Sequence, residues 1–405
     1  MNINKTGYQI YIDDNGKILQ ENDIYFATDE LIKKREDPAK WGVKKDGQNY
    51  PNIFTPGITA ADGQHRFPTI VKHRKTGKIA NIKVTKDGMR LPIHAGSCKQ
   101  VKGICFALPQ TGKTTFYLQT IMNERFQNML ASNSNIYFQE DLTETTSAQK
   151  TYRNKMLQLE KNQILPDTTL PGQKVTYPYY IKGERNDILF SLTDVSGEEC
   201  KQLNWNSNSI IMNDYFIIMI GADDILHGNR NYTYIISQLV SKLRIQRPER
   251  NYHILIVITK ADLLDWMNDP FLKKINTNTI GLKSDGSMYQ KIHKNGFSKS
   301  SFDYREQILV DYLYQKCPNL MNYLLAEFGR HVHFFATASI GCTPDETNHF
   351  SSEKYNPFSV DEPLLYILTK EKVFPEKNEE GVIDRFCNWA EKWINRLSDT
   401  EVEEY

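Results

Sequence analysis

Residues 104–115, ICFALPQTGKTT, decide the fold of this chain. An apolar run over residues 101–108 predicts a buried strand, and Gly112, Lys113 and Thr114 follow it at the start of a helix-compatible stretch. This order is typical of a phosphate-binding loop, in which backbone N–H groups and a helix N-terminus face an anion. The Lys side chain then reaches the phosphates, and the hydroxyl holds Mg²⁺.

The loop departs from the usual motif at its first position, where Ala107 replaces Gly. A methyl group is tolerated there if φ stays negative. We therefore expect the phosphates to be bound by Gln110, Thr111, Gly112, Lys113, Thr114 and Thr115.

Composition predicts a soluble globular protein of one large or two ordinary domains. The 405 residues are 24% charged and 40% hydrophobic, which is enough apolar material for a sizeable core. Lys and Arg number 50 against 49 Asp and Glu, so bulk charge gives no reason to expect nucleic acid or an anionic membrane as a partner. The longest strongly apolar run, residues 215–222, is too short to span a bilayer.

Cysteine usage predicts a reducing compartment. The six cysteines form no CxxC pair, which argues against a zinc knuckle or a disulfide framework. The N-terminal residues have no apolar segment of the kind found in signal peptides. We therefore expect the protein in the cytoplasm.

The chain divides into three regions by its sequence pattern. Residues 1–95 contain short β-like runs separated by turn signals, and they predict a small β-rich accessory region. Over residues 96–345, buried-type strands alternate with helical segments, which indicates an α/β domain with a mostly parallel sheet flanked by helices. Residues 346–405 predict a C-terminal helical segment packed on that domain, with an aromatic stripe at helical spacing over residues 384–397.

Strands and helices alternate through the central domain. The expected strands are residues 101–108, 174–182, 187–193, 215–220, 253–259 and 331–337. The expected helices include residues 114–130, 145–163, 232–245 and 305–328. Stretches near residues 131–165 and 266–301 are interpreted as insertions, and the polar tract 277–301 is expected to be a loop or a partner surface.

Two further motifs follow predicted strands, at the edge where α/β sheets bind ligands. Asp194 and Gly197 form a DxxG, in which the carboxylate can hold Mg²⁺ through water and the glycine N–H can approach a γ-phosphate. Thr259, Lys260 and Asp262 form a TKxD after the strand 253–259. Each motif is weak alone, but their order and their shared position after strands strengthen one another.

The TKxD motif indicates which base is bound. A carboxylate at Asp262 can accept hydrogen bonds from N1–H and the 2-amino group of guanine, whereas adenine offers no such pair of donors. The Lys260 stem can cover the face of the base. After the last predicted strand, the backbone of Thr337, Ala338 and Ser339 can present an N–H to guanine O6.

These motifs resemble those of the translation-factor-like and Ras-like (TRAFAC) P-loop GTPases, over roughly residues 98–345. The resemblance implies a Ras-like fold, binding of GTP and GDP with Mg²⁺, slow GTP hydrolysis, and switch regions that respond to the nucleotide. The phrase DVSGEE, residues 194–199, also resembles bacterial double-GTPase-type proteins found in conflict or defence systems. Those relatives often carry N-terminal zinc-ribbon cysteines, and residues 1–95 contain none.

The resemblance also implies a switch threonine just before the strand 174–182, which should pair antiparallel with the DxxG strand. Thr169 is the first choice for this residue and Thr168 is the second. The rivals Thr143, Thr145 and Thr146 are explained more simply as N-cap residues of the helix that follows. The catalytic residues implied are Lys113, Thr169, Gly197 and Glu198, and the metal ligands implied are Thr114, Thr169 and Asp194.

Hydrolysis depends on Glu198, which stands where Ras-like proteins have Gln. A carboxylate beside the γ-phosphate is repelled, yet it could orient or deprotonate water if its pKa rises. Alternatively, Glu198 turns away and hydrolysis is very slow without a protein partner. Three functions stay open: a hydrolysing regulatory switch that binds partners through its switch regions and insertions, a non-hydrolysing guanine-nucleotide scaffold, and an ATP-dependent P-loop NTPase.

Overall fold

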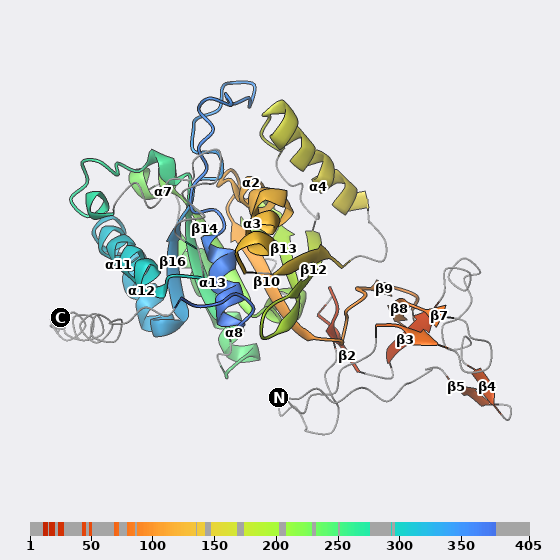
Figure 1. Cartoon of the computed structure of the whole chain (residues 1–405). Helices are drawn as coiled ribbons and strands as arrows, with labels where there is room; N and C mark the ends of the chain where they lie inside the picture. The colour runs from red at the N-terminus through yellow and green to blue at the C-terminus, as the bar shows by residue number, and fades with distance from the viewer. Residues whose placement is uncertain are drawn as a thin grey trace.

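The computed structural model describes most of the central domain and parts of the N-terminal region (Figure 1). The described residues are 11–14, 16–20, 23–27, 43–45, 48–50, 69–72, 79–85, 87–134, 136–141, 147–167, 174–201, 208–228, 232–249, 252–275, 293 and 296–377.

A seven-stranded sheet with the order β11-β12-β13-β10-β14-β15-β16 organises the molecule. Its parallel strands are β10 (Lys99–Ala107), β13 (Asp187–Val195), β14 (Tyr215–Gly221), β15 (His253–Thr259) and β16 (Val332–Ala336). Strand β12 (Lys174–Lys182) pairs antiparallel with β13, and β11 (Tyr137–Glu140) pairs antiparallel with β12 at the edge. The predicted mostly parallel sheet and the antiparallel partner of the DxxG strand are confirmed, whereas β11 was not predicted.

Helices cover both faces of this sheet because its central strands are apolar on both sides (Figure 1). One face packs against α2 (Lys113–Tyr117), α3 (Glu124–Ser134), α4 (Ser147–Leu157) and α13 (Glu362–Lys370). The other packs against α6 (Asn208–Ile211), α8 (Tyr232–Gln246) and α12 (Pro318–Phe328). Helix α11 (Lys299–Lys316) reaches both layers, with Phe302 in the first and Ile308 in the second.

Short elements join these layers. They are the π-helical turns η3 (Leu118–Met122) and η4 (Gln158–Asn162), helices α5 (Gly197–Lys201) and α7 (Ala222–His227), and the 3₁₀ turns η5 (Ala261–Leu263), η6 (Leu272–Lys274) and η7 (Gly329–His331).

Two long predicted helices are broken in the structure. The stretch 114–130 changes direction at Asn123, whose ψ of 115° is extended, so that η3 ends there and α3 begins anew. The stretch 305–328 is interrupted at Cys317, because Pro318 cannot continue a helix and instead occupies the first turn of α12. The predicted helix 232–245 is confirmed as α8. Helix α13 falls within the helical segment predicted over residues 346–405, although its bounds were not predicted. The aromatic stripe at 384–397 lies outside the described residues.

The N-terminal region contains small antiparallel sheets. Their strands are β1 (Tyr11–Ile12), β2 (Ile18–Leu19), β3 (Ile24–Ala27), β4 (Val43–Lys45), β5 (Gln48–Tyr50), β6 (Val71–Lys72), β7 (Ile79–Ala80), β8 (Ile82–Thr85) and β9 (Arg90–Leu91). Gln100 at the start of β10 accepts a hydrogen bond from the Ile12 N–H at 2.8 Å, and Leu189 at the start of β13 packs with Tyr11. These sheets therefore lie at the opposite end of the main sheet from α2 (Figure 1).

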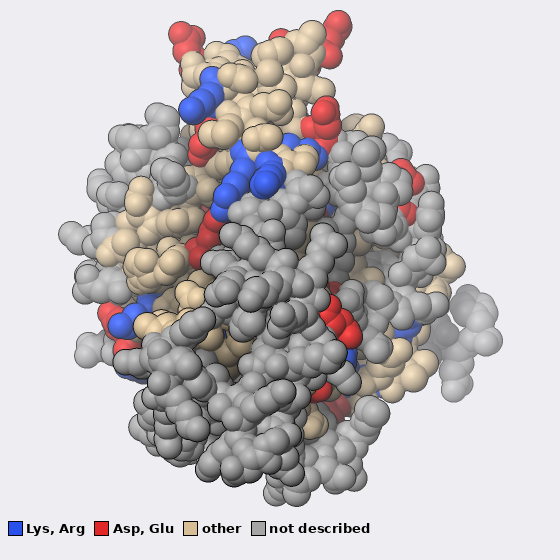
Figure 2. Space-filling model, turned by 90° about the vertical axis from the view of Figure 1, so that its right-hand side faces the viewer, with Lys and Arg blue, Asp and Glu red and all other residues tan. Residues whose placement is uncertain are grey.

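The molecular surface mixes charges of both signs. On the face shown in Figure 2, a short band of Lys and Arg side chains is flanked by Asp and Glu, in keeping with the net charge of +1. Within the described part of the chain, none of the helices combines the length and the apolar character needed to cross a bilayer.

Candidate functional site

The loop between β10 and α2 has the backbone of a tight, glycine-dependent turn. Gly112 precedes α2 with φ of 82°, and Gln110 has φ of 67°. The space around Gly112 is open, so glycine is needed there for its conformation rather than for room. Ala107 is the last residue of β10 and pairs with Met219. Strand backbone has a negative φ, and this is the condition under which the Ala107 methyl group was expected to be tolerated.

Two threonines hold this loop in place through buried hydroxyls. The Thr111 hydroxyl donates to the Leu108 carbonyl at 2.7 Å, and the Thr259 hydroxyl at the end of β15 donates to the Thr111 carbonyl at 2.5 Å. Both side chains are almost completely buried. The sequence assigned them to the nucleotide, but in the structure their hydroxyls bond to the protein backbone.

The loop between β10 and α2 and the DxxG motif meet through a buried ion pair. Lys113, the first residue of α2, pairs with Asp194 Oδ1 near the end of β13, 81 residues away. The Tyr152 hydroxyl from α4 donates to the other oxygen, Asp194 Oδ2, at 2.5 Å. All three side chains are at most 5% exposed. A carboxylate, an ammonium group and a phenol therefore share one buried point at the carboxyl edge of the sheet.

The DxxG glycine packs tightly against the loop between β10 and α2. A Cβ at Gly197 would lie 2.8 Å from the Pro109 nitrogen, a separation that real Cβ atoms essentially never show. Gly197 also begins α5, whose first turn contains the half-buried Glu198. The close approach explains why this position requires glycine.

The TKxD motif forms the second half of the same edge. Lys260 has φ of 52°, and its Nζ lies 2.9 Å from Asp223 Oδ2 in the first turn of α7. Burial acts to raise the pKa of Asp223, but the hydrogen bond and charge of Lys260 outweigh it, and the pKa is lowered. Burial raises the pKa of the Asp262 carboxyl, while Lys260 acts in the opposite direction. A ligand that donates hydrogen bonds to the Asp262 carboxylate would offset the free-energy cost of burying its charge.

The last motif is joined directly to TKxD. The Thr337 N–H donates to the Ile258 carbonyl at 2.8 Å, and the Thr337 carbonyl accepts from the Ala261 N–H at 3.1 Å. Ala338 is bridged to Phe358, and Ser339 is half-buried at the end of this segment. The two base-side motifs therefore form one hydrogen-bonded unit.

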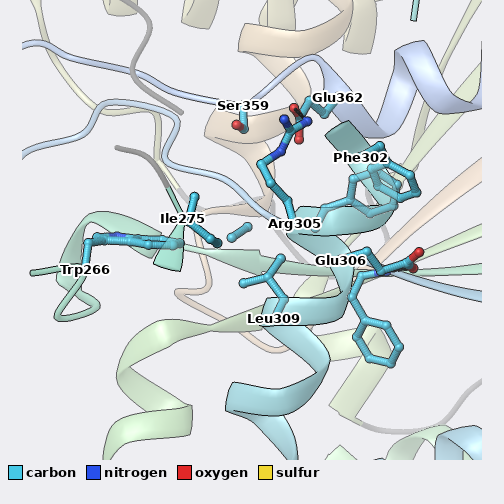
Figure 3. Close-up of a pocket in the computed structure, with 11 residues that line it drawn as sticks. Trp266, Ile275, Phe302, Arg305, Glu306, Leu309, Ser359 and Glu362 are labelled. Carbon is cyan, nitrogen blue, oxygen red and sulfur yellow. Dashed lines mark hydrogen bonds and ion pairs between the residues drawn. The ribbon is translucent and has the colours of Figure 1, made fainter. Parts of the chain in front are cut away.

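The cavity in Figure 3 lies next to this unit, because Ala336 at the end of β16 lines it. It is lined by Trp266, Ile275, Phe302, Arg305, Leu309 and Glu362, among others. Its volume of about 10 Å³ is roughly the space that one water molecule needs. Arg305 and Glu362 form a buried ion pair at its wall, which joins α11 to α13.

The structure gathers most of the predicted residues at one sheet edge. They lie at or just after the carboxyl ends of β10, β13, β15 and β16, and they are Gln110 to Thr115, Asp194, Gly197, Glu198, Thr259, Lys260, Asp262 and Thr337 to Ser339. Thr168 and Thr169 lie outside the described residues. The contacts of Tyr152 and Asp223 were not predicted, because they join elements that the motifs do not connect.

The residues at this edge suit a phosphate and a hard cation. The Thr114 hydroxyl and the Asp194 carboxylate offer oxygen ligands of the kind that Mg²⁺ prefers. Lys113 supplies a buried positive charge beside the tight turn at Gly112. These groups fit the Mg²⁺–nucleotide that the motifs predict.

No known family model matches this sequence, and no curated protein matches it either. Its function must therefore be inferred from the residues of the site.

Proposed function

We propose that the chain binds a guanine nucleotide with Mg²⁺ at the carboxyl edge of the main sheet and slowly hydrolyses GTP, as a cytoplasmic switch that binds protein partners. The observation that carries this proposal is the buried pair of Lys113 and Asp194, which joins the phosphate-loop motif to the DxxG motif. The base-side motifs lie at the same edge, where ligands of α/β sheets bind.

Each part of the edge then has a role. Lys113 neutralises phosphate charge and exchanges its carboxylate partner for phosphate oxygens. Thr114 and Asp194 hold Mg²⁺, which neutralises charge on the phosphates when bound. Asp262 reads guanine, and Lys260, oriented by Asp223, covers the base. Glu198 follows Gly197 beside the phosphate loop, from where it can orient water.

Titration with fluorescently labelled GDP and ADP tests the binding half of the proposal. The intact chain should prefer GDP, Lys113→Ala should lower affinity for GDP about 100-fold, and Asp262→Asn should do so selectively for guanine. Loss of charged hydrogen bonds at a buried site accounts for changes of this size. Lys316→Ala, on the surface of α11, is the matched lysine control and should bind like the intact chain. Equal affinity for both nucleotides, unaffected by Asp262→Asn, would identify an ATP-type site instead.

Single-turnover GTP hydrolysis tests the catalytic half. The intact chain should exceed Lys113→Ala when both are saturated with nucleotide. Equal rates in the presence of selective GDP binding would indicate a non-hydrolysing guanine-nucleotide scaffold. Glu198→Gln should keep binding and change only the hydrolysis rate, because Glu198 is proposed to orient water and not to hold the phosphates.

A further inference from the structure

Helix α4 lies beside the phosphate end of the site and is anchored to the sheet. The Gln149 amide donates to the Thr176 carbonyl of β12 at 2.9 Å, and the Tyr177 hydroxyl of β12 donates back to the Gln149 carbonyl. Arg153 forms an ion pair with Glu140 of β11. These contacts fix the rotation of α4 about its own axis and turn Tyr152 toward β13.

The far end of the α4 segment is also anchored. The Phe350 N–H donates to the Gln163 carbonyl at 3.0 Å, and the Leu165 N–H donates to the Asn348 carbonyl at 2.9 Å. Residues 348–350 belong to the segment that follows the Thr337–Ser339 motif. The α4 segment therefore connects the strand next to DxxG with the segment beyond the base-side motif (Figure 1).

Tyr152 occupies a closely packed position between these anchors. It is 1% exposed, and its ring packs edge-on against Tyr117 of α2 with centroids 5.7 Å apart. Its hydroxyl lies 2.5 Å from Asp194 Oδ2, while Lys113 pairs with Oδ1. A hydroxyl hydrogen bond to a charged carboxylate is stronger than one between neutral groups. The ring is thus held by packing, and the hydroxyl is directed at one oxygen.

We propose that Tyr152 is a positioning residue that fixes the orientation of the Asp194 carboxylate for Mg²⁺-dependent nucleotide binding. This inference rests on the proposed function. When Lys113 turns to the phosphates, the carboxylate loses the contact of Oδ1 with Lys113, whereas the bond from Tyr152 to Oδ2 stays compatible with a bound nucleotide. The hydroxyl then restrains rotation of the carboxylate and keeps Oδ1 directed at the Mg²⁺ side.

The test is Tyr152→Phe, which keeps the ring and removes only the hydroxyl. The readout is the Mg²⁺ concentration that gives half-maximal binding of labelled GDP, together with the GDP affinity in EDTA. Tyr152→Phe should raise the half-maximal Mg²⁺ concentration about 10-fold, as loss of a hydrogen bond to a charged group predicts. The affinity in EDTA should stay within about twofold of the intact chain, because the metal plays no part in it.

Tyr177→Phe is the matched control, since it removes a hydroxyl that joins β12 to the same helix without touching Asp194. It should leave the Mg²⁺ dependence unchanged. In an Asp194→Asn background, adding Tyr152→Phe should have no further effect. Thermal unfolding of each variant shows whether it is folded.

Three results would overturn the inference. The first is an unchanged or lower half-maximal Mg²⁺ concentration in folded Tyr152→Phe, and the second is an equal increase in Tyr177→Phe, which would assign the effect to helix docking. The third is an intact chain that binds GDP without any dependence on Mg²⁺. An intact chain that binds no GDP at all would refute the proposed function and this inference together, whereas the first two results refute the inference alone.

Discussion

Thr259 connects the TKxD motif to the loop between β10 and α2 through a single hydroxyl. It ends β15 one residue before Lys260, and its Oγ1 donates to the Thr111 carbonyl in the phosphate loop. The β-branched side chain suits the strand, and complete burial strengthens the hydrogen bond. This hydrogen bond therefore joins the loop between β10 and α2 to the end of the strand that leads into Lys260.

Thr259→Val should weaken this connection without changing which base is bound. Valine keeps the shape but leaves the Thr111 carbonyl without its hydroxyl donor, which should lower the free energy of unfolding by about 1–3 kcal/mol. Affinity for GDP should fall several-fold, while the ratio of GDP to ADP affinity should stay constant because Asp262 is intact. Urea unfolding and labelled-nucleotide titration measure the two effects.

Thr369→Val provides the comparison, because the Thr369 hydroxyl bonds to the Leu365 carbonyl within α13, away from the site. It should leave nucleotide affinity unchanged. Binding by Thr259→Val as tight as that of the intact chain would show that the loop does not depend on this hydroxyl.

The site residues that follow strands could be predicted because their position depends on local sequence. Lys113, Asp194 and Asp262 each come after an apolar run, and parallel strands bring their carboxyl ends to one edge. Tyr152 and Asp223 could not be predicted in this way. Tyr152 is 42 residues from Asp194, and Asp223 is 37 residues from Lys260, so each contact depends on how α4 and α7 pack.

At the level of elements, the central strands were predictable and several element ends were not. Apolar side chains on both faces identify β10, β14 and β15. Strand β11 was missed because it is short and half exposed. Helix α13 lies inside the helical segment predicted over residues 346–405, but its bounds were not predicted, because its short apolar centre is ambiguous between helix and strand. Two predicted helices are each divided in the structure, one by the extended backbone at Asn123 and one by Pro318. The helical spacing of apolar residues continues through both breaks, so the sequence pattern did not reveal them.

Arg305→Leu should strongly destabilise the packing of α13 on α11. Arg305 is 9% exposed and Glu362 is 6% exposed at the side chain (Figure 3), so the substitution leaves a buried carboxylate without its cation. Removing one member of a buried pair costs about 3–5 kcal/mol, measured as the free energy of unfolding in urea. The double variant Arg305→Leu, Glu362→Leu should recover most of the loss, since neither charge is then buried.

Lys299→Leu is the control on the same helix. Its partner Asp303 lies one turn away in a pair that is about one-third exposed, and such pairs contribute about 0–1 kcal/mol. If both leucine variants lost the same stability, the buried pair would not be what joins the two helices.

Over the whole molecule, the two ends of the main sheet have different surroundings. The N-terminal sheets contact the starts of β10 and β13, where Lys102 Nζ donates to the Asp13 carbonyl at 2.8 Å. The GKT, DxxG and TKxD motifs lie at the carboxyl ends of the strands. The sequence predicted β-like runs in the first region, but their docking depends on contacts such as Gln100 to Ile12, across 88 residues, which leave no local pattern.

The stability of the whole chain should fall below pH 6.5, with His293 as a main cause. Burial, reinforced by the charge of Arg305, lowers the pKa of His293 to about 3, and the ring stacks on Phe297. Between pH 6.5 and 3 the unfolded chain binds a proton that the folded chain does not, so folding loses about 1.4 kcal/mol per pH unit. The stability that neutral His293 contributes is complete above pH 6.5 and is lost as the pH falls.

His293→Phe should therefore reduce the pH dependence while keeping an aromatic ring against Phe297. Urea unfolding at pH 7.0 and 5.0 should show a loss in the variant that is about 2 kcal/mol smaller than in the intact chain. His227→Phe, at the exposed end of α7, should retain the full loss, since the buried His293 is intact in this variant. Identical pH dependence in His293→Phe and the intact chain would mean that His293 is protonated in the folded protein and that its burial does not exclude the charge.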